Sequence, residues 1–507
     1  MSISKKAGPN PLFGSLKSTT SIFGRSSYTW IEGDGMLHAV YFKRDSEGNW
    51  SVSYKNRYVE SETYKVEKGR EKPSFLPAIE GDSHAILAAF LLNHLRFGKV
   101  NKDISNTNVF QHSGKCYAIA ENYIPQEIDV ATLRTLGSWD INGDWDRPFT
   151  SHPKKAPGSG ELVIIGVEPK KPFLVLGVIS ADGKRLPHKV DLEFKRCILC
   201  HEIGITEKYN IIMDVPLTLD LNRLVQGGPL LKYEGDSYAR IGVMPRYGNA
   251  DSIKWFELEP HCTFHILNCF EDGHEVVVRG CRAPWSIVPG LGRSKSEFSS
   301  QKSDVQSAEE LFFSCAYEWR VNIEIGDVKE KNLTGTDLTM DMPFINDKFT
   351  GLRNAYGYTL VADSYASSEC GLPKYGSLAK LYFEEKNKTS KSEEGGEDRI
   401  KVEYHLLEEN QFCSGAAFVS KQGGLREDDG WVISFVHSED TNISQVHIID
   451  AQKFERGPVA KITLPQRVPY GFHGTFISET NSMPASLRLA YFFIQWQFFP
   501  PHVQNES

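Results

Sequence analysis

Residues 197–201 read CILCH, which places two thiols and an imidazole within five positions. The C-x-x-C-H spacing is that of c-type haem attachment, and C-x-x-C is also a redox pair or half of a zinc site. No second C-x-x-C is present to complete a four-ligand zinc site, and the N-terminus, MSISKKAGPNPLFG, has no apolar core of an export signal. Both facts disfavour the haem and zinc interpretations of this motif.

Four of the fifteen histidines stand beside apolar, strand-like runs and could lie at strand ends. They are His152 in RPFTSHPK, His201 in CHEIGIT, His265 in TFHILN and His473 in VPYGFHGTF. Imidazole is a ligand that suits Fe, Zn, Cu or Ni. Four neutral imidazoles leave the charge of a divalent ion uncompensated, so nearby carboxylates that accept the free ring N–H groups would favour such a site.

Residues this far apart need a scaffold that directs several strand ends to one point. The chain contains many short apolar runs separated by turns, such as ELVIIGV (161–167) and FLVLGVIS (173–180). GWVISFVHSEDTNISQVHIIDA predicts a hairpin around a polar turn. This pattern indicates an all-β sandwich, barrel or propeller, and a closed ring of sheets could direct the histidines to its axis. No repeat of fixed period is visible, so a WD40 or kelch pattern is not supported.

One segment predicts a helix. In GDSHAILAAFLLNHLRFGK, Asp82 or Ser83 can cap the first turn and Gly98 can end the helix. The helix is apolar nearly all round, which fits either a core-packed helix or an apolar lip that contacts a membrane or a lipid-like substrate. Residues 291–310 and 384–399 are predicted to be flexible surface loops. Residues 487–507 are expected to form an atypical C-terminal tail, which could pack on the core or dock at a membrane surface.

Composition excludes several classes of protein. The 507 residues carry a formal net charge of −8 and no basic run with interleaved aromatics, so no nucleic-acid partner is expected. Nine scattered cysteines do not form a secreted disulfide framework. No stretch approaches the ~20 apolar residues of a membrane span. We expect a soluble or peripheral protein of the cytoplasm or plastid stroma, because neither a signal peptide nor a complete transit peptide is visible.

Taken together and in order, several segments resemble the motifs of the carotenoid cleavage oxygenase family, in particular its plant carotenoid and 9-cis-epoxycarotenoid dioxygenases. These segments are GPNPLFG, EGDGMLHAVYF, SHPK, CHEIGITEKYNIIMDVPL, FHILNCFEDG, MDMPFIN, REDDGWVISFVH and RVPYGFHGTFI, and they span residues 8 to 477. The resemblance implies a single seven-bladed β-propeller over residues 1–507, with an iron site on its axis and a few helices capping one face. The chain begins almost at GPNP, so we expect it to lack part of the family's N-terminal region.

The resemblance also assigns roles to individual residues. It implies one Fe(II) per subunit, held by the four histidines, with outer carboxylates at Glu121, Asp341 and Glu427. The family most often has glutamate at the second of these positions. The shorter Asp341 must sit closer to its imidazole or reach it through water.

The implied reaction is the oxidative scission of a conjugated C=C bond of a carotenoid or apocarotenoid by O₂. Two alternatives remain at this point: the same chemistry on a phenylpropanoid or stilbenoid alkene, and a non-catalytic propeller that binds an apolar ligand. The residues of the motif CILCH are then expected to have different roles. His201 is expected to bind the metal, while Cys197 and Cys200 are expected to be small apolar residues that end a strand.

Overall fold

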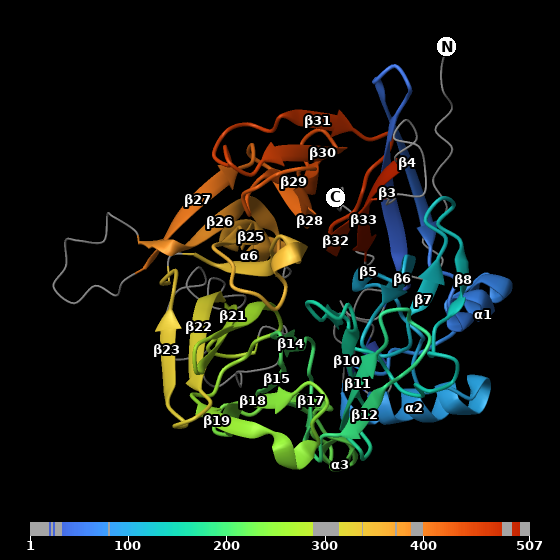
Figure 1. The fold of residues 1–507 in the computed structure, drawn as a ribbon. Helices are drawn as coiled ribbons and strands as arrows, with labels where there is room; N and C mark the ends of the chain where they lie inside the picture. The colour runs from blue at the N-terminus through green and yellow to red at the C-terminus, as the bar shows by residue number, and fades with distance from the viewer. Residues whose placement is uncertain are drawn as a thin grey trace.

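Antiparallel sheets of mostly four strands are arranged around a common centre (Figure 1). The computed structural model describes residues 20–21, 24–25, 33–79, 82–286, 314–336, 338–370, 373–386, 399–478 and 489–496. Within this part of the chain strands far outnumber helices, so the predicted all-β class is confirmed.

Four sheets follow one another in chain order, and three of them consist of four consecutive strands, while the third in order omits two intervening strands. The first contains β5 (Asn108–His112), β6 (Lys115–Ile119), β7 (Gln126–Ile128) and β8 (Thr135–Ser138). The second contains β9 (Lys154–Lys155), β10 (Leu162–Val167), β11 (Leu174–Ile179) and β12 (His188–Asp191). The third contains β14 (Gly204–Ile205), β15 (Tyr209–Asp214), β18 (Ala239–Pro245) and β19 (Lys254–Leu258). The fourth contains β20 (Ile266–Asp272), β21 (Glu275–Arg282), β22 (Cys315–Asn322) and β23 (Val328–Asn332).

The remaining strands form one large sheet, one four-stranded sheet built from strands of both terminal regions (the terminal sheet) and two small sheets. The large sheet has the order β24 (Met340–Phe344), β25 (Tyr356–Ala362), β26 (Tyr375–Lys386), β28 (Gln411–Ser420), β29 (Gly430–Ser438), β30 (Ile443–Asp450) and β31 (Ala460–Thr463), and β27 (Ile400–Leu406) also pairs with β26. The terminal sheet has the order β32 (Gly471–Ser478), β33 (Leu489–Trp496), β3 (Met36–Arg44) and β4 (Trp50–Tyr58), and all its pairs are antiparallel. The small sheets are β13 (Cys197–Ile198) with β16 (Leu217–Leu219) and β17 (Leu231–Tyr233), and β1 (Thr20–Ser21) with β2 (Gly24–Arg25).

The terminal sheet joins the N-terminal and C-terminal regions of the chain. Strand β33 lies between β32 and β3, so C-terminal and N-terminal strands share one sheet. Residues 489–496 are therefore a central strand of this sheet, and the prediction of an atypical tail is wrong for them. The sequence could not show this because the partner strand is more than four hundred positions away.

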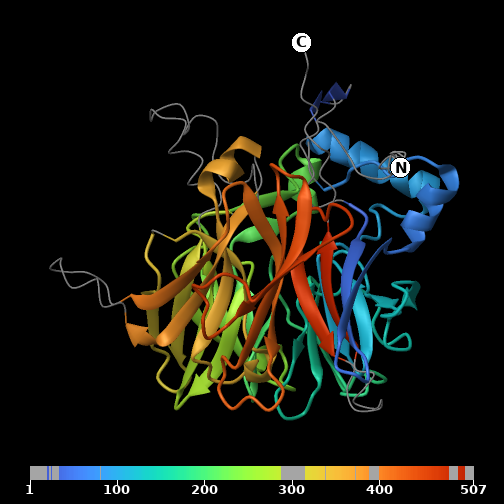
Figure 2. The same ribbon diagram turned by 90° about the horizontal axis from the view of Figure 1, so that it is seen from above.

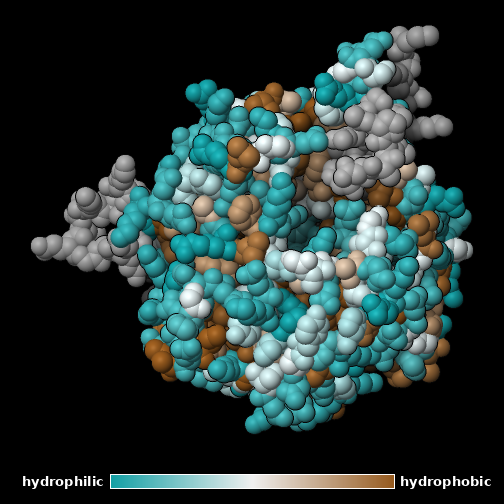
Figure 3. All heavy atoms as spheres, in the orientation of Figure 1, coloured by the Kyte–Doolittle hydropathy of each residue, from teal (hydrophilic) through white to brown (hydrophobic). Residues whose placement is uncertain are grey.

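The hydrophobic cores lie between neighbouring sheets. Val163 and Leu176 of the second sheet pack with Ile212 of the third. Val243 of the third sheet belongs to one cluster with Trp319 of the fourth, and Trp319 is fully buried. Both faces of a strand such as β10 are covered, which explains its continuous apolar run. The face of the molecule in Figure 3 is correspondingly mostly hydrophilic.

The helices and short helical turns lie outside the sheets. They are α1 (Glu62–Arg70), α2 (Ser83–Phe97), α3 (Leu221–Val225), α6 (Ser364–Cys370) and the 3₁₀ turns η1 (Ala250–Ser252) and η2 (Asp347–Phe349). Figure 2 shows α1 and α2 in blue and α6 in orange at the same end of the ring. The predicted helix is confirmed as α2, which ends at Gly98 in the left-handed region (φ 71°).

The predicted hairpin is confirmed, whereas most residues of the two predicted loops are not described. Strands β29 and β30 pair around the predicted turn, with Ser438 opposite Ile443. Residues 291–310 lie outside the described residues, as do most of residues 384–399. The exceptions include Glu384 to Lys386, which continue strand β26 instead of forming a loop.

Among the described residues, no helix combines the length and apolar character that crossing a bilayer would require.

Candidate metal centre

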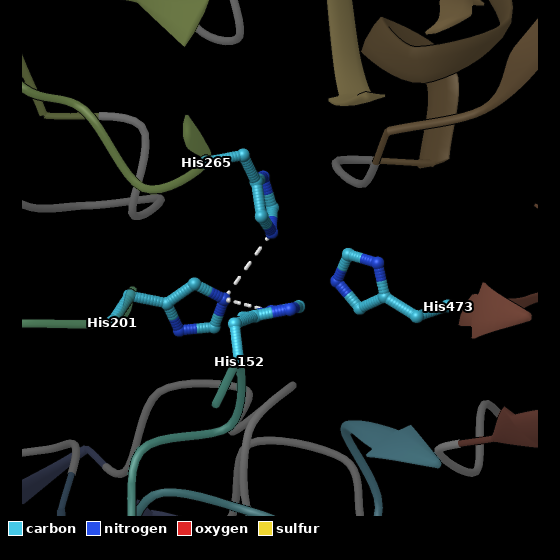
Figure 4. A group of neighbouring side chains, drawn as sticks. All are labelled: His152, His201, His265 and His473. Atoms are coloured by element: carbon cyan, nitrogen blue, oxygen red, sulfur yellow. Dashed lines mark hydrogen bonds between the residues drawn. The ribbon is translucent and has the colours of Figure 1, made fainter. Parts of the chain in front are cut away.

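The four predicted histidines meet at the centre of the ring of sheets. One nitrogen from each ring can be chosen so that all four lie within 4.8 Å of one another. The Nε2 atom of His201 lies 3.1 Å from Nε2 of His152 and 3.2 Å from Nε2 of His265. The His473 ring centroid is 4.3 Å from that of His152. Figure 4 shows the four rings converging from different segments of the chain.

Each histidine stands at or just before the start of a strand that borders its sheet. His152 precedes β9, His201 precedes β14, His265 precedes β20 directly, and His473 is the third residue of β32. All four strands are edge strands. Edge strands in four different sheets bring distant residues to one point, as the sequence predicted for strand ends in a closed ring.

Backbone contacts hold three of the segments together. His152 and Glu202 form a parallel β-bridge. Glu202 then accepts a hydrogen bond from the backbone N–H of Ile266 through Oε2, at 2.6 Å. The segments that carry His152, His201 and His265 are thus connected independently of any metal, which preorganises their side chains.

The nitrogen positions fit a single metal ion. With metal–nitrogen bonds of about 2.1 Å, two nitrogens at right angles on one ion lie about 3.0 Å apart. The two short separations around His201 match this value. Burial, together with the neighbouring imidazoles, holds the pKa of His152 and of His473 well below the usual range, so both rings are neutral donors.

Two carboxylates contact the outer nitrogens of the site. Glu121 pairs with Nδ1 of His201, and Asp341 Oδ1 lies 2.6 Å from Nδ1 of His265. Burial alone would lower the pKa of His265, but the charge of Asp341 and its hydrogen bond raise this pKa overall. The contact also shows that the shorter aspartate reaches its imidazole directly. These pairs fix which ring nitrogen carries the proton and leave Nε2 of each ring free to bind a metal.

The third predicted carboxylate lies elsewhere. Glu427 follows β28, and its oxygens accept hydrogen bonds from the backbone N–H groups of Ala355 (2.8 Å) and Tyr356 (2.9 Å). The prediction that Glu427 supports an iron-binding histidine is therefore wrong, because its carboxylate is used to fix the start of β25. Among the described residues, no carboxylate pairs with the ring of His473.

Sequence reasoning missed one neighbour of the site. The Nδ2 atom of Asn108, at the start of β5, lies 3.4 Å from Nδ1 of His152. The same amide donates to the backbone oxygen of Ser151 at 2.9 Å, which holds it beside the ring. Its position at the start of an apolar run, NVF, is the same kind of signal that identified the histidines.

The two cysteine thiols of CILCH contact backbone oxygens and do not belong to the four-histidine site. Cys197 lies in β13, and its thiol donates to the backbone oxygen of Glu168 at 3.3 Å. Cys200 donates to the backbone oxygen of Glu202 at 3.6 Å. Burial raises the pKa of each thiol to about 12, so neither forms a thiolate at neutral pH. Both side chains are buried, as expected for small apolar residues, but Cys197 begins the two-residue strand β13 and Cys200 lies beyond it, so the prediction that they end a strand is wrong.

The histidines separate two cavities of different character. A cavity of about 310 Å³ borders His201, His265 and His473 and is lined mainly by apolar side chains, among them Phe264 and Leu231. A smaller cavity of about 130 Å³ borders His152, His265 and His473, and charged or polar side chains line much of it. A metal at this site would face an apolar chamber large enough for part of an extended hydrophobic ligand.

These features define a class: an all-β protein with a partly buried cluster of four imidazoles that can bind a metal, beside an apolar chamber. Comparison with known proteins gives the family. A profile of the family described as retinal pigment epithelial membrane protein matches residues 6–478. The chain belongs to this family, which includes the carotenoid oxygenases.

Plant enzymes are among the relatives by sequence. A carotenoid 9,10(9',10')-cleavage dioxygenase of Crocus sativus is 32% identical over 490 residues, covering 94% of this chain and 83% of its own. A second, from Pisum sativum, is 33% identical over 490 residues and covers 94% and 84%. A chloroplastic 9-cis-epoxycarotenoid dioxygenase of Oryza sativa subsp. japonica is 27% identical over 492 residues and covers 94% and 70%.

Solved structures support the same fold. Lignostilbene dioxygenase of Pseudomonas brassicacearum superposes with a TM-score of 0.70 at 21% identity, covering 87% of this chain and 91% of its own. A cobalt-substituted apocarotenoid oxygenase of Synechocystis has a TM-score of 0.65 at 19% identity, covering 87% and 92%.

The carboxylate contacts predict different effects for two glutamates. Glu121→Gln should weaken metal binding about 10- to 100-fold, because the amide cannot accept the His201 N–H with the charge that a carboxylate supplies. Glu427→Gln should leave metal affinity unchanged and lower the free energy of unfolding by about 1–3 kcal/mol, because it weakens two backbone contacts. Metal titration of both variants, with their thermal melts, checks this. A comparable loss of metal affinity in Glu427→Gln would contradict the assignment.

Proposed function

We propose that this protein is a non-haem iron dioxygenase that cleaves a conjugated C=C bond of a carotenoid or apocarotenoid to two carbonyl products. The observation that carries the proposal is the convergence of four imidazole nitrogens at the wall of an apolar chamber. Plant relatives at 32–33% identity bear the name of carotenoid cleavage enzymes, which supports the substrate class.

His152, His201, His265 and His473 would hold one Fe(II) per chain. Bound there, iron would supply the binding and activation of O₂. Glu121 and Asp341 keep the rings of His201 and His265 oriented. A solved structure of the same fold is named as cobalt-substituted, which supports a metal site in this fold.

The chamber walls would position the substrate. Side chains such as Phe264, Leu199 and Leu231 exclude water and offer apolar contact to a polyene. The ring of Phe264 stacks on that of His201, with centroids 5.0 Å apart and planes at 24°. This contact places an apolar surface directly beside the metal ligands, so one double bond of an extended substrate can lie next to the iron.

The architecture behind this site is proposed to be a seven-bladed propeller. The large sheet divides naturally into two four-stranded units, β24–β27 and β28–β31, since β26 and β28 share only the pair Tyr375–Cys413. These two units and the five other four-stranded sheets make seven units, and each would form one blade. An experimental structure of the chain tests this proposal, and a number of blades other than seven would reject it.

Cleavage products provide the direct test. The protein is purified without oxygen and loaded with Fe(II), then supplied with β-carotene or shorter apocarotenals and O₂, and the aldehydes are identified by mass. Products that add up to the substrate with one oxygen atom on each fragment are expected, and their masses identify the cleaved bond. Absence of products from every polyene, with iron bound, would reject the proposal. A stilbenoid included in the assay distinguishes the alternative alkene substrate.

We also propose that the protein contacts a membrane surface from the cytoplasm or the plastid stroma. Helix α2 buries Ile86 and Ala89, while Leu91 (59% exposed) and Leu95 (70% exposed) face outward. Phe90, between them, lines the large cavity. The sequence left open whether this helix packs on the core or forms an apolar lip, and α2 does both. An apolar face beside the cavity would let an apolar substrate pass from a bilayer without crossing water.

The proposed compartment, cytoplasm or plastid stroma, is tested by locating a fluorescent fusion of the full chain in plant cells.

The exposed leucines predict a binding difference. Replacing Leu91 and Leu95 together by serine should reduce co-sedimentation with phosphatidylcholine vesicles at least about threefold, because two apolar side chains no longer enter the lipid. Leu425→Ser serves as the matched control, since Leu425 is 97% exposed but lies in the β28–β29 loop. Equal co-sedimentation of the double variant and the unaltered protein would show that α2 does not dock on lipid.

A further inference from the structure

The large cavity has two regions of different chemistry. One region lies under α2 and α3 and is lined by apolar side chains that include Phe90, Leu221 and Leu230. The other lies where β26 and β32 begin, and it is lined by Lys374 and Tyr470. A ligand that fills both regions would meet hydrocarbon at one end and polar groups at the other.

Lys374 is held in place by a local network. Its Nζ lies 2.9 Å from Oε1 and 3.1 Å from Oε2 of Glu439, and it stands 4.8 Å above the ring of Phe412. Tyr470 donates its hydroxyl to Oε1 of Glu439 at 2.9 Å. The Lys374 side chain is 17% exposed and that of Glu439 38% exposed, so this ion pair lies where the cavity wall meets solvent.

This arrangement leaves capacity for one more acceptor. An ammonium group has three N–H donors. Among the described residues, Glu439 is the one side chain that accepts from Nζ, with its two oxygens. A third donor therefore remains for an oxygen atom of a ligand. A ligand that brought only hydrocarbon to this region would desolvate the ammonium without replacing the lost contact.

The charge balance limits which oxygen fits. Glu439 already neutralises Lys374, and the carboxylate of Glu439 would repel a second carboxylate at the same place. An uncharged hydroxyl or carbonyl oxygen can accept the remaining N–H without this repulsion. Hydrogen bonds from a charged donor are stronger than those between neutral groups, which makes Lys374 an effective point of selection.

We propose that Lys374 selects polyene substrates with one hydrocarbon end and one end that carries a hydroxyl or carbonyl oxygen. This inference rests on the proposed function and names the substrate class of the same site. The oxygenated end lies at Lys374, and the hydrocarbon end lies under α2 and α3. Lys374 then determines which way the polyene lies across the metal centre and hence which double bond is cleaved.

The test compares polyenes of equal length whose ends are hydrocarbon, hydroxyl, aldehyde or carboxylate. The unaltered iron-loaded enzyme should show a KM about tenfold lower for the hydroxyl and aldehyde forms than for the hydrocarbon form, the size of one hydrogen bond to a charged group. Lys374→Met should remove this difference by raising KM for the oxygenated forms only, with kcat little changed. Lys374→Arg should restore it, because arginine keeps a charged donor.

A second variant tests the charge argument without removing Lys374. Glu439→Gln leaves the lysine charge uncompensated, so KM for the carboxylate form should fall about tenfold relative to that for the aldehyde form. Iron content and thermal melts are measured for each variant to confirm that it is folded. Equal kcat/KM for all four ends in the unaltered enzyme, or a loss in Lys374→Met that is the same for every end, would overturn this inference. Absence of cleavage of any polyene would instead reject the proposed function.

Discussion

His201→Ala is expected to abolish stoichiometric iron binding and to reduce cleavage by more than about 100-fold. Loss of an outer partner of a metal ligand typically costs 10- to 100-fold, and loss of the ligand itself should exceed this. The Nε2 atom of His201 lies 3.1 Å from that of His152 and 3.2 Å from that of His265, so it is close to two of the other predicted ligands. Its removal also leaves Glu121 without the imidazole N–H that it accepts.

The control for this variant is in the same five residues. Cys197→Ala changes a buried side chain that contacts only the backbone oxygen of Glu168 among the described hydrogen bonds. It should retain iron and near-normal activity. Iron is measured per chain by elemental analysis, and products are measured by mass. If Cys197→Ala lost the metal while His201→Ala kept it, the ligand assignment within CILCH would be reversed.

The histidine quartet was predictable because two kinds of evidence agreed. Each of the four stands beside an apolar strand, and the ordered motifs around them resemble those of one family. Strand ends from different sheets of a ring can meet only near its centre. The large separations of the four histidines in the sequence therefore did not argue against a shared site. The contact of Asp341 with His265 also followed from the motif, and its 2.6 Å distance shows that aspartate suffices there.

Glu427 shows where this reasoning failed. The motif REDDG resembles the family pattern, but a carboxylate in a strand-connecting loop can equally bind nearby backbone N–H groups, as Glu427 does. No local pattern distinguishes the two uses, because the difference depends on which distant strand lies opposite. Lys374 was missed for the same reason: its cavity position depends on Glu439 and Tyr470, which belong to other segments.

Ending the chain after residue 488 is expected to prevent folding. This truncation removes β33, which forms eight residue pairs with β3 and six with β32. At about 1 kcal/mol for each backbone hydrogen bond, the loss is comparable to the 5–15 kcal/mol that stabilises a typical domain. It also exposes the unpaired edges of β3 and β32, which favour aggregation. His473 lies on β32, so any chain that remained soluble should not bind iron tightly.

The decisive comparison is with a chain that ends after residue 496. That chain keeps every β33 pair, and it should melt cooperatively and bind one iron. Both chains are expressed in parallel, and their soluble yield, thermal melts and iron content are compared. A 1–488 chain that matched the longer one in all three would show that β33 is dispensable for closing the ring. The expected difference instead makes β33 part of the metal centre's support, since among the described strands β32, which carries His473, pairs only with β33.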